Sequence, residues 1–179
     1  MSLTKAAVIK FSHEIWERPS LKHAVYVGTL SLLITLLAQG TLDVFYAGGS
    51  LKSQPESYEY GADLRTAIML VLVAPLLETL ISQAGVIGLL GLIRVNGKLV
   101  VWLSAIGFAY MHFWTTPLSA DVLIQMLPII PTGYLLGALY YKLLKREGWR
   151  SGFKYTMIAH ATHNGIVFGL ICILEFFPD

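Results

Sequence analysis

Four polar residues lie deep inside the most apolar stretches of this chain: Glu78, His112, His160 and Asn164. Each lies well inside a run long enough to span a membrane, where an ionisable side chain costs several kcal/mol unless it has a partner. A carboxylate, two imidazoles and an amide are the groups that a water-activating hydrolytic site needs. Their types therefore predict one shared hydrolytic site.

The spacing of these residues is compatible with a shared site. His160 and Asn164 are four apart in HATHN, so they share one helix face, and His112 follows Phe108 at the same spacing in FAYMH. At about 1.5 Å of rise per residue, Glu78, His112 and His160 lie roughly 24, 21 and 13 Å from the expected cytoplasmic helix ends. A helix tilt closes the remaining gap in depth. We therefore expect three helices to present one polar cluster near mid-membrane.

Each polar residue taken singly also has a purely structural interpretation. A His in a membrane helix is often a hydrogen-bonding group between helices, and Asn and Gln often hold helices together. Four such residues at compatible depth favour a shared function. His163 points to another helix face and is expected to be a packing residue or a secondary polar contact. Three further polar residues are expected to line the same cavity: Thr79, Ser82 and Gln83.

The composition predicts an integral membrane protein. Hydrophobic residues make up 55% of the 179 residues and charged residues only 13%, whereas soluble domains carry about 25% charged residues. The net charge of +2 and the lack of a basic stripe argue against nucleic-acid binding. The expected fold is an all-α polytopic transmembrane helix bundle of about five spans, forming a single domain over residues 1–179 without internal repeats.

Five apolar runs define the expected spans. They cover about residues 21–42, 64–93, 99–114, 120–144 and 152–177. The fourth run is expected to bend at Pro128 and Pro131. Residues 1–20 are expected to form an amphipathic helix at the membrane surface. Small residues four apart predict close helix packing at three pairs: Ala84 and Gly88, Gly133 and Gly137, Gly165 and Gly169.

The charged residues predict an orientation. If each run spans once, most basic residues lie on one side of the membrane, together with the N-terminus, and most acidic residues lie on the other. The positive-inside rule then places the N-terminus in the cytoplasm and the C-terminus outside.

The polar motifs resemble those of the CPBP (Abi) family of intramembrane proteases, which includes the type II CAAX prenyl endopeptidases. The hallmark of that family is EExxxR on one helix, FxxxH on a later one and HxxxN or HxxxD near the C-terminus. Phe108 to His112 matches the second motif and His160 to Asn164 the third, within a similar region of roughly residues 64–174. The first motif departs, because Glu78 is kept but Thr79 and Gln83 replace the second Glu and the Arg.

The resemblance implies an intramembrane endopeptidase that acts on a membrane protein or a lipidated peptide in the lipid bilayer. In the mechanism it implies, Glu78 assisted by His112 activates a water molecule, while His160 and Asn164 stabilise the oxyanion. It also implies that no cofactor is needed. The spacing leaves open a zinc-dependent protease with Glu78, His112 and His160 as ligands.

A second class of function also fits the sequence. The protein is then a non-catalytic membrane scaffold or substrate-binding subunit, as is the scaffold subunit of gamma-secretase, which resembles the same family. The altered first motif is what raises this alternative. A transporter is disfavoured, because five spans without an inverted repeat are unusual for one.

Overall fold

The computed structural model describes residues 20–46 and 62–177, and every regular element within them is helical. The expected amphipathic helix over residues 1–20 lies almost wholly outside the described residues. The helices and their bounds are α2 (Leu21–Tyr46), α3 (Leu64–Ile68), η1 (Met69–Val73), α4 (Ala74–Glu78), η2 (Thr79–Gly85), α5 (Val86–Leu92), α6 (Gly97–Met111), α7 (Ala120–Met126), α8 (Ile130–Glu147) and α9 (Trp149–Phe176). The segments from α3 to α5 form one continuous helical run.

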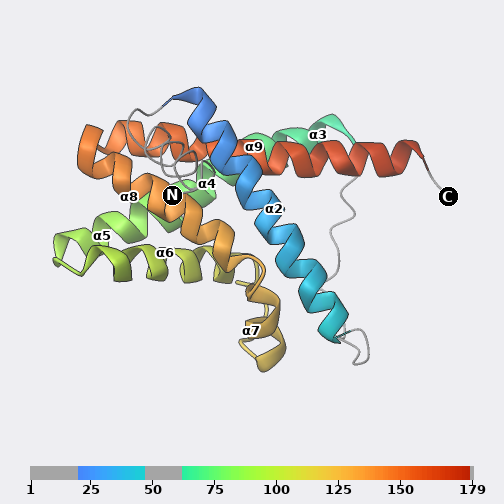
Figure 1. The fold of residues 1–179 in the computed structure, drawn as a ribbon, viewed down its shortest axis with the longest axis horizontal. Coiled ribbons are helices and arrows are strands. Elements are labelled where there is room, and N and C mark those ends of the chain that lie inside the picture. Colours follow the sequence, from blue (N-terminus) through green and yellow to red (C-terminus); the bar gives the residue numbers. More distant parts are fainter. Residues whose placement is uncertain (1–19, 47–61, 178–179) are drawn as a thin grey trace, which may run out of the picture.

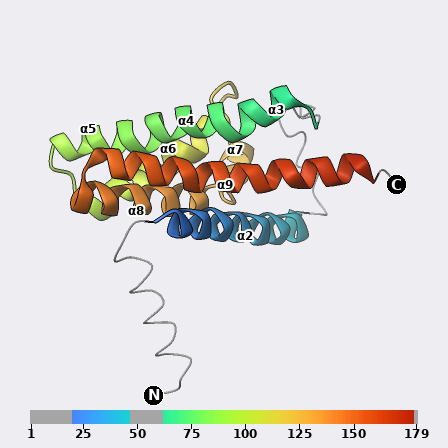
Figure 2. The ribbon, with the colours of Figure 1, turned by 90° about the horizontal axis from the view of Figure 1, so that it is seen from above.

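The central helix of the bundle is α9. Figure 2 shows it between α2 on one side and the α3–α5 run on the other, while α2 crosses the bundle obliquely in Figure 1. Buried apolar side chains of four helices meet in the core, including Val27 of α2, Phe108 of α6, Leu136 of α8 and Ala159 of α9. This arrangement brings the three motif-bearing segments together around α9.

Three described helices are long and apolar enough to cross a membrane: α2, the α3–α5 run and α9. The pair α7 and α8 makes a fourth if it counts as one span, and it bends by 54° at the break that contains Pro128. The expected bend at Pro128 is therefore confirmed, whereas Pro131 lies in the first turn of α8. The expected count of five is not confirmed, because α6 has only 15 residues and a span needs about 20.

Polar side chains define where three helices begin. Asp63 accepts a hydrogen bond from the Thr66 backbone N–H at 2.6 Å and caps α3. Asn96 caps α6 in the same way through the Lys98 N–H, within the turn that its Asn-Gly sequence suggests. Ser119 caps α7. Such caps satisfy backbone donors that lack a helical partner.

Only one of the three predicted small-residue pairs packs closely on both of its residues. A Cβ added to Gly133 would lie 2.9 Å from the Ala105 carbonyl oxygen, and one on Gly137 would lie 3.3 Å from Ser104 Oγ, so α8 packs tightly on α6. Around Gly88 and Gly169 no described atom lies within 4 Å of such a Cβ. Those two predictions are wrong, because Gly88 and Gly169 are only partly buried and no described neighbouring helix approaches them closely.

Candidate active site

The helix that carries Glu78 is irregular on both sides of that residue. It contains two π-helical segments, η1 before α4 and η2 directly after Glu78. In η1 the Ala74 N–H donates to the Met69 carbonyl, five residues back. The next donor in this ladder is Pro75, which has no N–H, so the Leu70 carbonyl lacks a helical partner. π-helical turns of this kind are frequent at functional sites.

The side chain of Asn164 supplies the missing partner. Its Nδ2 donates to the Leu70 oxygen at 2.9 Å, across 94 positions of sequence. Asn164 therefore ties α9 to the irregular turn ahead of Glu78. The amide has a second hydrogen, which this bond leaves available for a ligand.

We predict that Asn164 and Pro75 are coupled in stability. Asn164→Leu should lower the free energy of unfolding by about 1–3 kcal/mol, since it leaves the Leu70 carbonyl buried and unpaired. In a Pro75→Ala background, where the residue regains its N–H, the same change should cost less. Denaturant unfolding of the four proteins in detergent measures the difference. Equal costs in both backgrounds would contradict the assignment of Asn164 as partner of the orphaned carbonyl.

The structure brings Glu78, His112 and His160 together. Oε2 of Glu78 lies 3.4 Å from Nε2 of His160 and 4.0 Å from Nε2 of His112. The Glu78 side chain is 21% exposed and that of His160 only 2%. Glu78 Oε2 accepts no hydrogen bond from the described residues. The carboxylate is thus partly buried, and the two imidazoles lie next to it.

The ring of His112 is oriented by its own helix. Its Nδ1 lies 3.0 Å from the Phe108 carbonyl oxygen, and a carbonyl only accepts, so Nδ1 carries the hydrogen and Nε2 is an acceptor in the neutral ring. Nε2 and Glu78 Oε2 are then two acceptors 4.0 Å apart, too far for a direct hydrogen bond. One water molecule can bridge them by donating a hydrogen to each. Such a water is polarised for nucleophilic attack.

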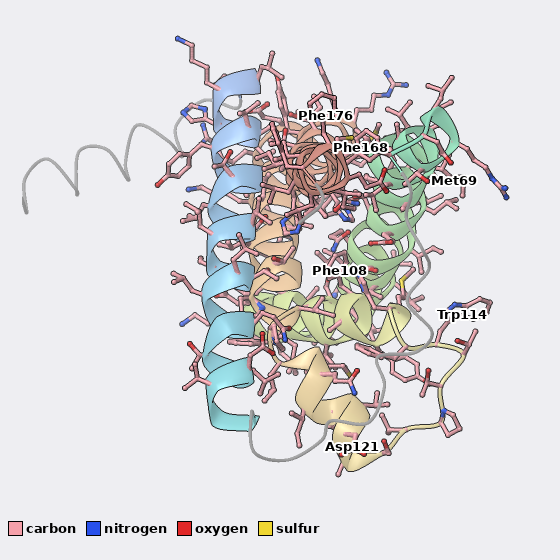
Figure 3. All side chains as sticks on the ribbon, turned by 90° about the vertical axis from the view of Figure 1, so that its right-hand side faces the viewer. Met69, Phe108, Trp114, Asp121, Phe168 and Phe176 are labelled. Atoms are coloured by element: carbon pink, nitrogen blue, oxygen red, sulfur yellow. The ribbon has the colours of Figure 1, made fainter. Side chains whose placement is uncertain are left out.

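Phe108 packs against both imidazoles. Its ring centroid lies 5.1 Å from that of His112 and 5.3 Å from that of His160, edge-on in each case, and Figure 3 shows the side chain in the middle of the bundle. Gly133 makes room for it, since a Cβ there would lie 2.9 Å from Phe108 Cδ1. The Phe of the FxxxH pattern therefore holds both histidine rings in place.

A cavity of about 180 Å³ lies beside the histidines. It is lined by Thr35, Phe108, His112, Ile129, Thr132, His160, His163 and Asn164. Glu78 is not a lining residue but adjoins the cavity through His112 and His160. Thr79, Ser82 and Gln83 do not line it, contrary to expectation, because they are buried against neighbouring helices. At about 30 Å³ per water molecule, the cavity has room for several.

A second set of polar residues around this cavity was missed from the sequence. Thr35 Oγ1 lies 2.6 Å from Thr132 Oγ1, and Ser31 Oγ lies 2.8 Å from His163 Nδ1. The expectation that His163 makes a secondary polar contact is confirmed, and His163 also lines the cavity. The available signal was the four-residue spacing of Ser31 and Thr35, which puts two hydroxyls on one face of an apolar helix.

The two departures from the family's first motif are neutral and buried. Thr79 Oγ1 lies 3.5 Å from His160 Nδ1. One turn further along η2, Gln83 is fully buried, and neither atom of its amide hydrogen-bonds to a described residue. Thr156 is equally buried and unpaired one turn before His160. The α3–α5 run is antiparallel to α9, so Gln83 and Thr156 lie at the same level.

We predict that Gln83 and Thr156 share one polar site, directly or through a water. Either Gln83→Leu or Thr156→Val alone should lower the free energy of unfolding, because it leaves the other group buried without a partner. The loss of unfolding free energy in the double variant should be about 1 kcal/mol smaller than the sum of the losses in the two single variants. Chemical unfolding of all four proteins tests this coupling. Additive effects would show that the two groups do not interact.

Three features define the class of protein: a helical bundle, a lipid-compatible exterior and a carboxylate–imidazole cluster inside it. Among the described residues, no group of three His, Cys, Asp or Glu side chains is arranged to hold a metal ion. The family model "Type II CAAX prenyl endopeptidase Rce1-like" matches residues 61–166, and the chain belongs to this family. No curated protein and no solved structure matches the chain. The protein is a multi-pass integral membrane protein similar to CAAX proteases.

Proposed function

We propose that this protein is an intramembrane endopeptidase that hydrolyses a peptide bond in a lipidated, CAAX-like substrate. The observation that carries the proposal is the position of Glu78 Oε2, 3.4 and 4.0 Å from the Nε2 atoms of two histidines, in a chain of the Rce1-like family. A desolvated carboxylate beside two imidazoles is suited to take a proton from water.

The proposed reaction begins with a water bridged between Glu78 Oε2 and His112 Nε2. Glu78 takes a proton as the water oxygen attacks the scissile carbonyl. The second amide hydrogen of Asn164 and the Nε2–H of His160 stabilise the developing oxyanion. The carbon–nitrogen bond then breaks, and the proton on Glu78 passes to the leaving amine. Glu78 is then a carboxylate again, so the charge of the enzyme is the same before and after the cycle.

The altered first motif is compatible with this chemistry. Thr79 and Gln83 are both neutral, so the loss of the family's second Glu and Arg leaves no unpaired charge in the bundle. Glu78 is then the sole carboxylate beside the two imidazoles among the described residues. Its removal should therefore greatly slow the reaction.

The proposal is tested with the purified protein in liposomes and a farnesylated CAAX peptide. Mass spectrometry should detect release of the tripeptide that follows the prenylated cysteine, and a chelator should leave the rate unchanged. Loss of the rate on chelation, with recovery on added zinc, would favour the metal-dependent alternative. Binding of the peptide without cleavage would favour the scaffold alternative, which the altered first motif supports.

The proposed orientation has the N-terminus in the cytoplasm. Arg94 lies in the α5–α6 turn and Lys98 in the first turn of α6, while the α8–α9 turn is flanked by Lys145 and Arg150. Figure 1 shows both turns at the same end of the bundle. Basic turns face the cytoplasm. In a Cys172→Ser background, Lys98→Cys should react with an impermeant maleimide only from the cytoplasmic side. Labelling from outside would reverse the orientation.

A further inference from the structure

The hydrogen bonds around His163 assign the state of its ring. Ser31 Oγ lies 2.8 Å from the Gly28 carbonyl oxygen and 2.8 Å from His163 Nδ1. A hydroxyl has one hydrogen, and a carbonyl only accepts. Both bonds form together only if Ser31 donates to Gly28 and His163 Nδ1–H donates to Ser31. In the neutral ring, Nε2 is then a hydrogen-bond acceptor, and it has no partner among the described residues.

The direction of the hydrogen bonds can be assigned in the same way for the neighbouring pair Thr35 and Thr132. Thr132 Oγ1 donates to the Ser31 carbonyl at 3.2 Å, so its single hydrogen is used. The 2.6 Å contact with Thr35 is then a bond that Thr35 donates. The hydrogens of both hydroxyls therefore point into the protein. What remains at the cavity wall is the oxygen lone pairs of Thr35 and the Nε2 lone pair of His163, both of which belong to lining residues.

The cavity thus has two chemically different sides. One side carries the Asn164 amide hydrogen and the Glu78–His160–His112 cluster. The other, made by α2 together with α8 and His163, offers acceptors only. A peptide that enters a membrane-embedded site must find acceptors for its backbone N–H groups, because lipid supplies none. The family match covers residues 61–166, so α2, which contributes Thr35 to this side of the cavity, lies outside the matched region.

We propose that Thr35 and His163 form a subsite that binds backbone N–H groups of the peptide substrate in extended conformation. This inference rests on the proposed function for the nature of the ligand. It assigns these residues to substrate binding and assigns Ser31 and Thr132 to positioning them. Loss of the acceptor atoms of Thr35 and His163 should therefore weaken substrate binding and raise KM while kcat changes little.

Binding is measured with the farnesylated CAAX peptide, made fluorescent, on the Glu78→Gln protein, so that no cleavage intervenes. Thr35→Val keeps the side-chain volume, His163→Phe keeps a planar ring, and each removes an acceptor, so each should raise Kd about tenfold. Thr29→Val, on the same helix with its hydroxyl bonded to the Val25 carbonyl, should leave Kd unchanged. Unchanged Kd in both wall variants would overturn the proposal.

A backbone-methylated peptide gives a second, matched test. N-methylation at the bound amide should weaken binding to the parent protein about tenfold and make no further difference in Thr35→Val or His163→Phe. Nitrogen-15 NMR of His163 should find the hydrogen on Nδ1. A hydrogen on Nε2 would contradict the assignment of His163 as a hydrogen-bond acceptor in the subsite. If the parent protein binds but never cleaves the peptide, the proposed protease function fails while this subsite stands.

Discussion

Glu78→Gln should lower the rate of peptide hydrolysis by about 10²–10⁴-fold, the usual contribution of a general base. Glutamine keeps the volume and the acceptor oxygen of the side chain but takes no proton from water. The fold should persist, because the amide oxygen of glutamine can accept from the Nε2–H of His160, which lies 3.4 Å from the position of Glu78 Oε2. The measurement is the rate of tripeptide release together with the melting temperature of the same preparation.

Glu147→Gln provides the matched control for this variant. Glu147 is an exposed carboxylate at the end of α8, where it accepts a hydrogen bond from Ser151 at 2.9 Å. The same change there should leave the rate within about twofold, since an exposed hydrogen bond contributes little. Full hydrolytic activity of Glu78→Gln would remove Glu78 from the mechanism.

Gly28→Ala should lower the free energy of unfolding by about 3 kcal/mol, at the upper end for overpacked sites. A Cβ on Gly28 would collide with the Ala159 carbonyl oxygen and lie 2.8 Å from Thr162 Cβ. The carbonyl belongs to the backbone of α9, so α2 must move away from α9 to relieve the contact. That movement would also separate Ser31 from His163. Thermal or denaturant unfolding of the purified protein in detergent measures the effect.

Gly40→Ala is the control within the same helix and should have the opposite sign. No described atom lies within 4 Å of a Cβ at Gly40, and Ala exceeds Gly in helix propensity by about 0.8–1 kcal/mol. This variant should therefore be neutral or more stable. If Gly28→Ala is tolerated as well as Gly40→Ala, the tight α2–α9 contact does not exist in the membrane protein.

The meeting of Glu78, His112 and His160 could be anticipated from the sequence, because each lies inside an apolar run where a polar group needs a partner. Helical rise alone left His160 shallower than the other two. The structure removes this mismatch, since His160 Nε2 lies closer to Glu78 than His112 Nε2 does. What the three residues do chemically stays a prediction that the variants above test.

The π-helical turns around Glu78 could not be read from local sequence. Pro75 signals a disturbed hydrogen-bond ladder, but the choice between a kink and a π-turn depends on Asn164, which is 94 positions away and supplies the donor to Leu70. A contact of that range is a property of the folded bundle. The same holds for Gln83, which is buried only once η2 lies against its neighbouring helices.

The role of α2 was also hidden, although its polar residues are visible in the sequence. Ser31 and Thr35 look like ordinary hydroxyls on an apolar helix, where they usually bond to their own backbone. Their partners, His163 and Thr132, are 132 and 97 positions away. The short α6 was equally unforeseen, because residues 99–114 are apolar enough to suggest a span while the helix itself ends at Met111.

The most direct test of the central claim is hydrolysis of the farnesylated CAAX peptide in water enriched in oxygen-18. The purified protein in liposomes should release the tripeptide and place one heavy oxygen in the new carboxyl group of the prenylated product. Glu78→Gln should show neither product nor label over the same time. Label and product that form equally in both proteins, or no cleavage by the unaltered protein, would contradict the account.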